Sequence, residues 1–195
     1  MKINIIGAGP SGCYSAYVLS KYGYDVKVYE EHSKIGLPFQ CTGLVTSAIR
    51  KFVKENSYVV NKIKEARIFS PNGNCCQIKL SKPNFVLDRV SFDRYLAENA
   101  VSEGAKIILK SKFKELSIQK GKVISKIGNR KIESDVVVGA DGPNSKVAMS
   151  SGLYGKRKFV IGHQIRLKKK NDNICLLYTS PSPRDLSTSR MPSPA

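Results

Sequence analysis

The sequence predicts an α/β fold built on a parallel sheet. Three stretches of the 195-residue chain support this prediction: an N-terminal strand–helix–strand unit, a later helix followed by a strand, and an apolar strand that ends in glycine. Hydrophobic residues make up 41% of the chain, which is enough for a buried core at this length. The sequence is therefore that of a globular protein.

The first stretch, residues 3–30, reads as a short apolar strand, a glycine turn, an amphipathic helix and a second strand. Gly7, Gly9 and Gly12 form the pattern G-x-G-x-x-G, in which the glycines allow a tight turn, a close approach to a pyrophosphate and helix–strand packing. Glu30 ends the second strand, where a carboxylate can accept hydrogen bonds from ribose hydroxyls. We interpret this unit as a dinucleotide-binding motif.

The second stretch, residues 86–109, places Arg89 just before a helix whose apolar positions recur at helical spacing. Arg89 is a natural charge partner for a pyrophosphate, and a solvated arginine near a helix start is the alternative. Asp93 and Arg94 are expected to be surface charges. A glycine at position 104 ends the helix, and a strand follows.

The third stretch, residues 134–147, contains three consecutive valines that suit a strand covered on both faces. Asp141 and Gly142 follow at the carboxyl end of this strand, the edge where open α/β sheets bind ligands. An ordinary Asp-Gly turn is the alternative interpretation. If the prediction holds, these residues belong to the same site as the glycine turn.

Between these stretches, residues 43–56 read as a basic amphipathic helix, and two hairpins are expected, at about 64–80 and 113–127. His32 and His163 are expected to have no catalytic role. From residue 175 the chain is rich in serine and proline and lacks apolar periodicity, so we expect a disordered tail. This tail resembles a translated sequencing adapter, and we expect the natural protein to continue past Asn173 with other residues.

Charge and cysteine usage limit the partners. The formal net charge is +18, and the lysines are scattered rather than clustered among aromatics, so no nucleic-acid partner is expected. A solvated lysine-rich surface is the simplest interpretation, and attraction to anionic substrates or an anionic membrane face is the alternative. The five cysteines lack paired spacing, which favours free thiols, a cytoplasmic location and no metal site.

Together the three stretches resemble FAD-dependent oxidoreductases of the p-hydroxybenzoate-hydroxylase-like class, and most of all the geranylgeranyl reductase family. The matching patterns are the glycine motif with Glu30, "L-D-R-x-x-F-D-x-x-L" around Arg89, and "G-A-D-G-x-x-S" around Asp141 and Gly142. The resemblance implies a glutathione-reductase-like three-layer FAD-binding fold with antiparallel pieces of a substrate domain. It assigns FAD binding to Gly7, Gly9, Gly12, Glu30, Arg89, Asp141 and Gly142.

The resemblance also implies a domain division and a reaction. Residues 1–158 would form the FAD-binding domain, interrupted by the hairpin at 64–80, and residues 159–174 would begin the substrate domain. The expected reaction is reduction of carbon–carbon double bonds in prenyl lipid chains by hydride from reduced flavin, with NAD(P)H and a ferredoxin as the two candidate electron donors. Contact with a membrane surface is expected for such a substrate, and the 195-residue chain alone is expected to be inactive.

Cys41 lies in "P-F-Q-C-T-G", which matches the family pattern P-x-x-C-x-G on the flavin-ring side of the site. An isolated alkene accepts hydride poorly unless a proton arrives with it, so we expect Cys41 to supply or relay that proton. Burial as a small hydrophobic residue is the alternative. The alternative for the whole protein is an FAD-dependent monooxygenase or quinone-linked dehydrogenase with another substrate, and a non-enzymatic basic binding module is the least favoured.

Overall fold

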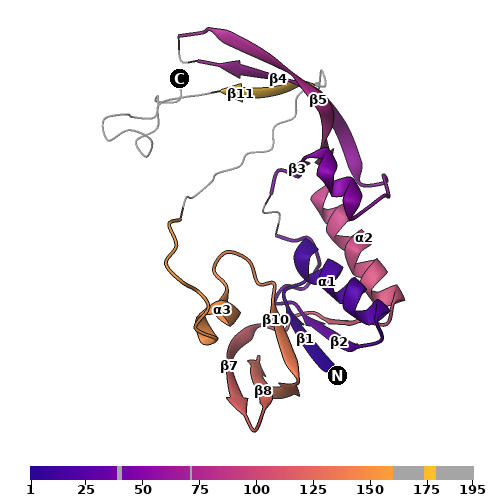
Figure 1. Cartoon of the computed structure of the whole chain (residues 1–195), viewed down its shortest axis with the longest axis vertical. Helices are drawn as coiled ribbons and strands as arrows, with labels where there is room; N and C mark the ends of the chain where they lie inside the picture. Colours follow the sequence, from indigo (N-terminus) through magenta and orange to yellow (C-terminus); the bar gives the residue numbers. More distant parts are fainter. Residues whose placement is uncertain (39–40, 71, 160–173, 179–195) are drawn as a thin grey trace. The chain divides into compact units, whose positions relative to one another are not determined.

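The structure is a computed structural model that describes residues 1–38, 41–70, 72–159 and 174–178. The chain divides into two compact units (Figure 1). Unit 1 is formed by the described residues of Met1–Cys41 and Asp88–His163, and unit 2 by those of Thr42–Leu87 and Gln164–Ala195. Unit 2 therefore takes up more of the chain than the hairpin at 64–80 that we expected to interrupt the FAD-binding domain.

Unit 1 is built on a four-stranded parallel sheet, which confirms the α/β fold class. In spatial order its strands are β10 (Val136–Gly139), β1 (Lys2–Ile6), β2 (Asp25–Tyr29) and β6 (Lys106–Ile108). Ile5 of β1 is fully buried and pairs with Val28 of β2 and Val138 of β10. Successive residues of β1 are buried, because both faces of the sheet are covered.

Two helices pack against each other and against this sheet: α1 (Pro10–Lys21) and α2 (Arg89–Ser102). The small residues Cys13 and Ala16 are fully buried on α1, and Phe92 and Leu96 are buried on α2. The Asp88 side chain caps α2 by accepting a hydrogen bond from the Ser91 N–H at 2.8 Å, which fixes where the helix begins.

A three-stranded antiparallel sheet forms a further layer of unit 1, with β7 (Phe113–Gln119), β8 (Lys122–Ile127) and β9 (Arg130–Ser134). It confirms the hairpin predicted at 113–127. Ile6 and Tyr29 of the parallel sheet form a buried cluster with Phe113, Ile127 and Val147. The short helix α3 (Lys146–Ser150) contributes Val147, so this cluster joins the parallel sheet, the antiparallel sheet and α3.

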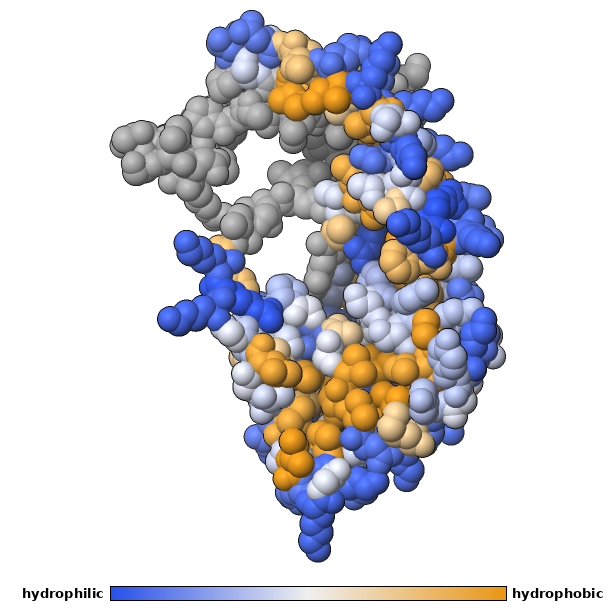
Figure 2. Space-filling model, viewed as in Figure 1, coloured by the Kyte–Doolittle hydropathy of each residue, from blue (hydrophilic) through white to orange (hydrophobic). Residues whose placement is uncertain are grey.

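Unit 2 is a sheet in the order β11, β4, β5, β3. Its strands are β3 (Leu44–Val45), β4 (Val59–Phe69), β5 (Cys75–Leu87) and β11 (Ile174–Tyr178). The long antiparallel hairpin of β4 and β5 confirms the hairpin predicted at 64–80 and extends it at both ends. Figure 2 shows hydrophobic and hydrophilic residues side by side on the surface of this unit.

Two sequence-based expectations differ from the structure of unit 2. The amphipathic helix predicted at 43–56 is wrong: Leu44 pairs with Val86 of β5, and only a 3₁₀ helix, Ser47–Lys51, follows. Pairing with β5 outweighs the helical periodicity. In addition, β11 reaches into the segment from residue 175 that we expected to be disordered, because its apolar run pairs in parallel with β4. His163 lies outside the described residues.

Candidate functional site

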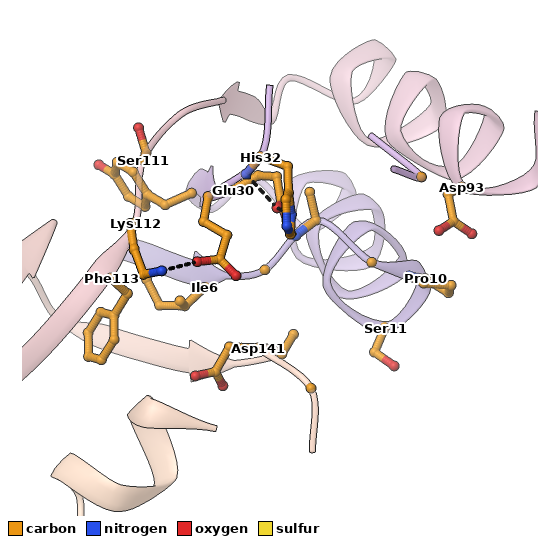
Figure 3. A pocket seen from close by; sticks show the side chains of 18 of the residues that line it. Ile6, Pro10, Ser11, Glu30, His32, Asp93, Ser111, Lys112, Phe113 and Asp141 are labelled. Carbon is orange, nitrogen blue, oxygen red and sulfur yellow. Dashed lines mark hydrogen bonds and ion pairs between the residues drawn. The ribbon is translucent and has the colours of Figure 1, made fainter. Parts of the chain in front are cut away.

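A cavity of about 580 Å³ opens in unit 1, where the carboxyl ends of β1, β2 and β10 meet (Figure 3). Ligands bind at this edge in open α/β sheets. The cavity brings together most of the predicted cofactor-binding residues, namely Gly7, Gly9, Glu30, Arg89, Asp141 and Gly142. These residues come from four separate stretches of sequence, so the fold assembles the arrangement that the motifs predicted.

The three glycines of the motif meet different surroundings. A Cβ atom on Gly7, whose φ is +101°, would lie 2.4 Å from the Ala140 carbonyl oxygen, and one on Gly12 would lie 1.9 Å from the Gly7 carbonyl oxygen. Glycine is therefore required at both positions, because a side chain would clash with the protein's own backbone. Apart from its chain neighbours, a Cβ on Gly9 would meet no atom of the described residues within 4 Å, although Gly9 lines the cavity. Gly9 is thus the glycine whose open side is available to a ligand.

The N-terminus of α1 faces this cavity through Gly9, Pro10 and Ser11. In the described chain no side chain caps this end of α1, and its first turn contains no acidic residue. The N–H groups of a first helical turn have no partners within the helix, and the helix dipole favours an anion there. The residues present therefore fit the pyrophosphate of a dinucleotide.

Glu30 lies directly after β2, and its carboxylate is fixed beside the glycine turn. Its Oε2 accepts a hydrogen bond from the Ala8 N–H at 2.8 Å, and its Oε1 accepts one from the His32 N–H at 2.9 Å. The Glu30 side chain is 12% exposed. A carboxylate held in this way can still accept hydrogen bonds from ribose hydroxyls, because each oxygen has two lone pairs.

Arg89 and Asp93 form a fork at the start of α2, with Arg89 Nε to Asp93 Oδ1 and Arg89 Nη2 to Asp93 Oδ2 both at 3.1 Å. The expectation that Asp93 is a surface charge is wrong: Asp93 is 5% exposed, because it lies on the face of α2 that packs inward. Burial raises the pKa of the Asp93 carboxyl by more than the Arg89 guanidinium lowers it. Arg94 is exposed, as expected.

Cys41 is half-buried and lies next to Arg89, outside the group of residues that line the cavity. Burial opposes the charge of Arg89, but the hydrogen bonds and charges of Asp93 and Cys41 outweigh it and raise the pKa of Arg89. Two residues predicted for separate roles, Cys41 and Arg89, are therefore neighbours. Gly36 lets the preceding loop approach, since its Cβ would lie 2.9 Å from the Val90 Cα atom.

Asp141 organises the loop after β10. Its Oδ1 accepts a hydrogen bond from the Ser145 hydroxyl at 2.5 Å, and its Oδ2 accepts one from the Val147 N–H at 3.1 Å. The same loop includes Gly142, whose φ is +79°. Asp141 thus shapes this wall of the cavity and also accepts an N–H of the first turn of α3, a second role that the motif alone did not predict.

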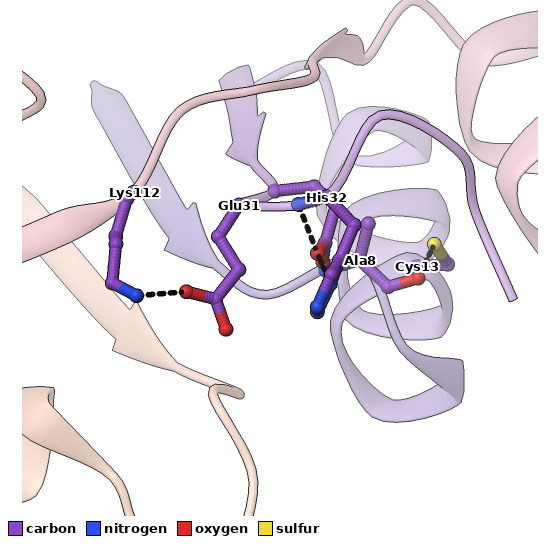
Figure 4. A network of polar contacts seen from close by, with 6 residues as sticks. Ala8, Cys13, Glu31, His32 and Lys112 are labelled. Atoms are coloured by element: carbon purple, nitrogen blue, oxygen red, sulfur yellow. Dashed lines mark hydrogen bonds and ion pairs between the residues drawn. The ribbon is translucent and has the colours of Figure 1, made fainter. Parts of the chain in front are cut away.

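Sequence reasoning gave no role to His32 and did not consider Lys112, which also line the cavity. His32 Nδ1 lies 2.6 Å from Glu30 Oε1, and Lys112 forms an ion pair with Glu31 at 3.0 Å (Figure 4). The sequence feature that could have indicated His32 is its position two residues after Glu30. For Lys112 no sequence signal was present, because the fold alone brings it near Glu31.

Comparisons with known proteins agree with this geometry. The NAD(P)-binding Rossmann-like domain family matches residues 5–60. The chain is 33% identical to a Methanosarcina barkeri protein named "uncharacterized protein in nifH2 5′ region", over 76% of this chain and 86% of that protein. It is 34% identical to digeranylgeranylglycerophospholipid reductase of Methanosarcina acetivorans, over 76% of this chain and 39% of the reductase. The chain belongs to the same family as the Methanosarcina barkeri protein.

Solved structures share the fold. A geranylgeranyl bacteriochlorophyll reductase-like protein of Thermoplasma acidophilum matches 92% of this chain and 51% of its own, with a TM-score of 0.74 and 23% identity. CtdE in complex with FAD matches 75% of this chain and 39% of its own, with a TM-score of 0.62 and 20% identity. The chain spans about two fifths of the digeranylgeranylglycerophospholipid reductases that it matches, at 39% and 41% of their length in two of them.

Proposed function

We propose that unit 1 binds FAD and that the protein containing this chain reduces carbon–carbon double bonds in prenyl chains of lipids. The observation that carries the proposal is the joining of the glycine turn, Glu30 and Arg89 around one cavity in a chain 34% identical to a digeranylgeranylglycerophospholipid reductase. We further propose that unit 1 is the cofactor domain and unit 2 part of the substrate domain. The domain boundary implied by the resemblance, with the FAD-binding domain ending at residue 158 and the substrate domain beginning at residue 159, belongs to the same proposal.

The residues of the cavity fit the ADP half of FAD. The open side of Gly9 and the first turn of α1 would receive the pyrophosphate, and Glu30 would accept hydrogen bonds from the ribose. Arg89, Asp141 and Gly142 would line the continuation of the site. FAD, when bound, supplies the hydride for the reduction.

Cys41 is the proposed proton donor for the substrate carbon. Its Sγ–H would give the proton, and the thiolate that remains would lie beside the Arg89 guanidinium, which stabilises a negative charge. Asp93 keeps that guanidinium in place through two hydrogen bonds at 3.1 Å. Cys41, in the loop before unit 2, would thus supply the proton, and Arg89, at the start of α2, would stabilise the thiolate that remains.

The proposed substrate is a lipid, so we also propose that the protein works at a membrane surface. Among the described residues, no helix has the length and apolar character needed to cross a bilayer. On the hairpin of unit 2, the exposed Val60 and Ile78 accompany the exposed lysines Lys62, Lys64 and Lys79. Such a mixture suits contact with anionic headgroups, and binding to anionic but not neutral vesicles in a sedimentation assay would test it.

The reaction is tested with the enzyme that contains this chain, a geranylgeranyl lipid, and either NAD(P)H or reduced ferredoxin under anaerobic conditions. Mass spectrometry should show the gain of a hydrogen pair at each reduced double bond. A product that carries oxygen in aerobic assays, with no saturated lipid, would instead identify a monooxygenase and reject the proposal.

The role of Cys41 is tested by Cys41→Ser, with the exposed Cys75→Ser as the matched control. Loss of a positioned proton donor should slow double-bond reduction by about 100-fold to 10,000-fold while flavin content stays unchanged. The control should retain wild-type turnover. Unchanged turnover in Cys41→Ser would show that the thiol only fills space.

A further inference from the structure

The environment of the Glu30 carboxylate contains more donors than the glycine motif requires. Oε2 accepts the Ala8 N–H at 2.8 Å, as the turn predicts. Oε1 accepts two further hydrogen bonds, one from the His32 N–H at 2.9 Å and one from His32 Nδ1 at 2.6 Å. A carboxylate oxygen only accepts, so Nδ1 carries the proton of this bond. One residue therefore occupies Oε1 with both its backbone and its ring.

His32 is itself held rigidly. Its carbonyl oxygen accepts a hydrogen bond from the Lys110 N–H at 3.0 Å, and the Glu30 carbonyl oxygen accepts one from the Ser111 N–H at 2.7 Å. Lys110 adopts a φ of +54°, a left-handed conformation that is unfavourable for a lysine. The chain thus accepts local backbone strain at the segment that anchors His32 beside the cavity (Figure 4).

The neighbouring ion pair provides a contrast. Lys112 and Glu31 are 61% and 47% exposed in their side chains, so their pair lies in water and contributes little. The Glu30 side chain is 12% exposed and the His32 side chain 40% exposed, so their bond is shielded from water on the carboxylate side. A shielded, charge-assisted hydrogen bond orients its carboxylate far more strongly than an exposed one.

We propose that His32 is a positioning residue for the cofactor: its ring fixes Glu30 Oε1, so that the remaining lone pair of the carboxylate, on Oε2, is directed to a ribose hydroxyl of the adenosine half. This inference rests on the proposed function, because it needs an adenine dinucleotide in the cavity. The inference adds His32 to the residues of the dinucleotide-binding motif, which are the glycines and Glu30. Its role depends on Nδ1 and not on the size of the imidazole.

The test compares three substitutions in the enzyme that contains this chain, by titration with FAD and with ADP. His32→Ala removes the ring bond, His32→Asn places an amide N–H near the position of Nδ1, and His32→Gln places it one bond further out. Lys126→Ala removes an exposed ion pair with Glu115 in the same unit and serves as the control. Melting midpoints without ligand show whether each variant folds as the wild type does.

His32→Ala should weaken both FAD and ADP binding about tenfold, the effect of losing one charge-assisted hydrogen bond. His32→Asn should restore affinity to within about threefold of wild type, His32→Gln should not, and the control should bind as wild type does. Rescue by asparagine is a result that a purely space-filling role of the ring would not produce.

Two results would overturn the inference while leaving the proposed function intact: wild-type affinity in His32→Ala, or equal losses in all three variants, which would mean that Nδ1 is not the group that matters. A wild-type enzyme that binds neither FAD nor ADP would reject the proposed function itself, and the inference with it.

Discussion

The glycine turn of unit 1 and the hairpin of unit 2 differ in what holds their backbones in place. In unit 1 the chain packs against its own backbone at Gly7 and Gly12, and β1 is buried on both faces. In unit 2 the hairpin of β4 and β5 is held by strand pairing, and residues 75–79 of β5 are all exposed. The difference teaches that close backbone contacts define the proposed cofactor site, while the hairpin tolerates change over much of its surface.

The largest expected effect is that of a methyl group at the tightest contact. In Gly12→Ala the new Cβ would lie 1.9 Å from a backbone oxygen that cannot rotate away, so we expect a loss of about 4 kcal/mol or more in unfolding free energy. Urea denaturation measures it.

The matched change in unit 2 is Gly73→Ala. Gly73 has a φ of +84°, but the methyl group of an alanine there would meet no atom within 4 Å, so only backbone strain of about 1 kcal/mol is expected. Equal losses in the two variants would remove the contrast between the units.

The next effect in size concerns the fork at the start of α2. Asp93→Ala leaves the Arg89 guanidinium, 19% exposed, without its carboxylate, and we expect a loss of about 3 kcal/mol in unfolding free energy. The exposed pair of Lys126 and Glu115 supplies the comparison, where Lys126→Ala should cost about 0.5 kcal/mol or less. Chemical denaturation of both variants at neutral pH provides the measurement.

Asp93 also predicts a pH dependence. Its pKa is raised on folding from the ordinary value of 3.8, so the folded protein binds more protons than the unfolded chain just above that pH. The stability that comes from this raised pKa is therefore fully present below pH 3.8 and is lost as the pH rises through the folded value, whereas the ion pair with Arg89 remains. Asp93→Asn should lack this downward slope, and an identical pH profile in both proteins would contradict the assignment.

The smallest effect concerns thiol reactivity in the two units. Burial, together with the charges of Asp93 and Glu30, raises the pKa of Cys13 to about 12, whereas Cys75 and Cys76 of unit 2 are exposed. In the folded protein at pH about 8, iodoacetamide should modify Cys75 and Cys76 and leave Cys13 intact. Peptide mapping by mass spectrometry reads the outcome, and early labelling of Cys13 would mean that α1 opens readily.

The sequence predicts unit 1 better than unit 2 for a physical reason. The role of Gly12 depends on Gly7, which lies five residues before it, so a short motif carries that information. The prediction of a helix at 43–56 failed because the pairing of Leu44 with Val86 connects residues far apart in the chain. The hydrophobic periodicity of a short segment does not indicate with which distant strand the segment pairs.

Within the site, the limits of prediction have the same origin. Glu30 and Arg89 are found from their spacing to glycine and helix patterns. The burial of Asp93 depends on which face of α2 turns inward, and the ion pair of Lys112 with Glu31 joins two loops that the fold brings together. Residue type and spacing therefore identify the motif residues, and only the packed structure reveals the groups that hold them.

The central claim is that unit 1 holds FAD against the open side of Gly9, and Gly9→Val tests it most directly. A valine there meets no protein atom near its Cβ, so the variant should fold with a melting midpoint close to that of the wild type. It should nevertheless lose FAD binding in a fluorescence titration, because the side chain would occupy the space of the pyrophosphate. A folded Gly9→Val protein that binds FAD as tightly as the wild type would contradict the claim.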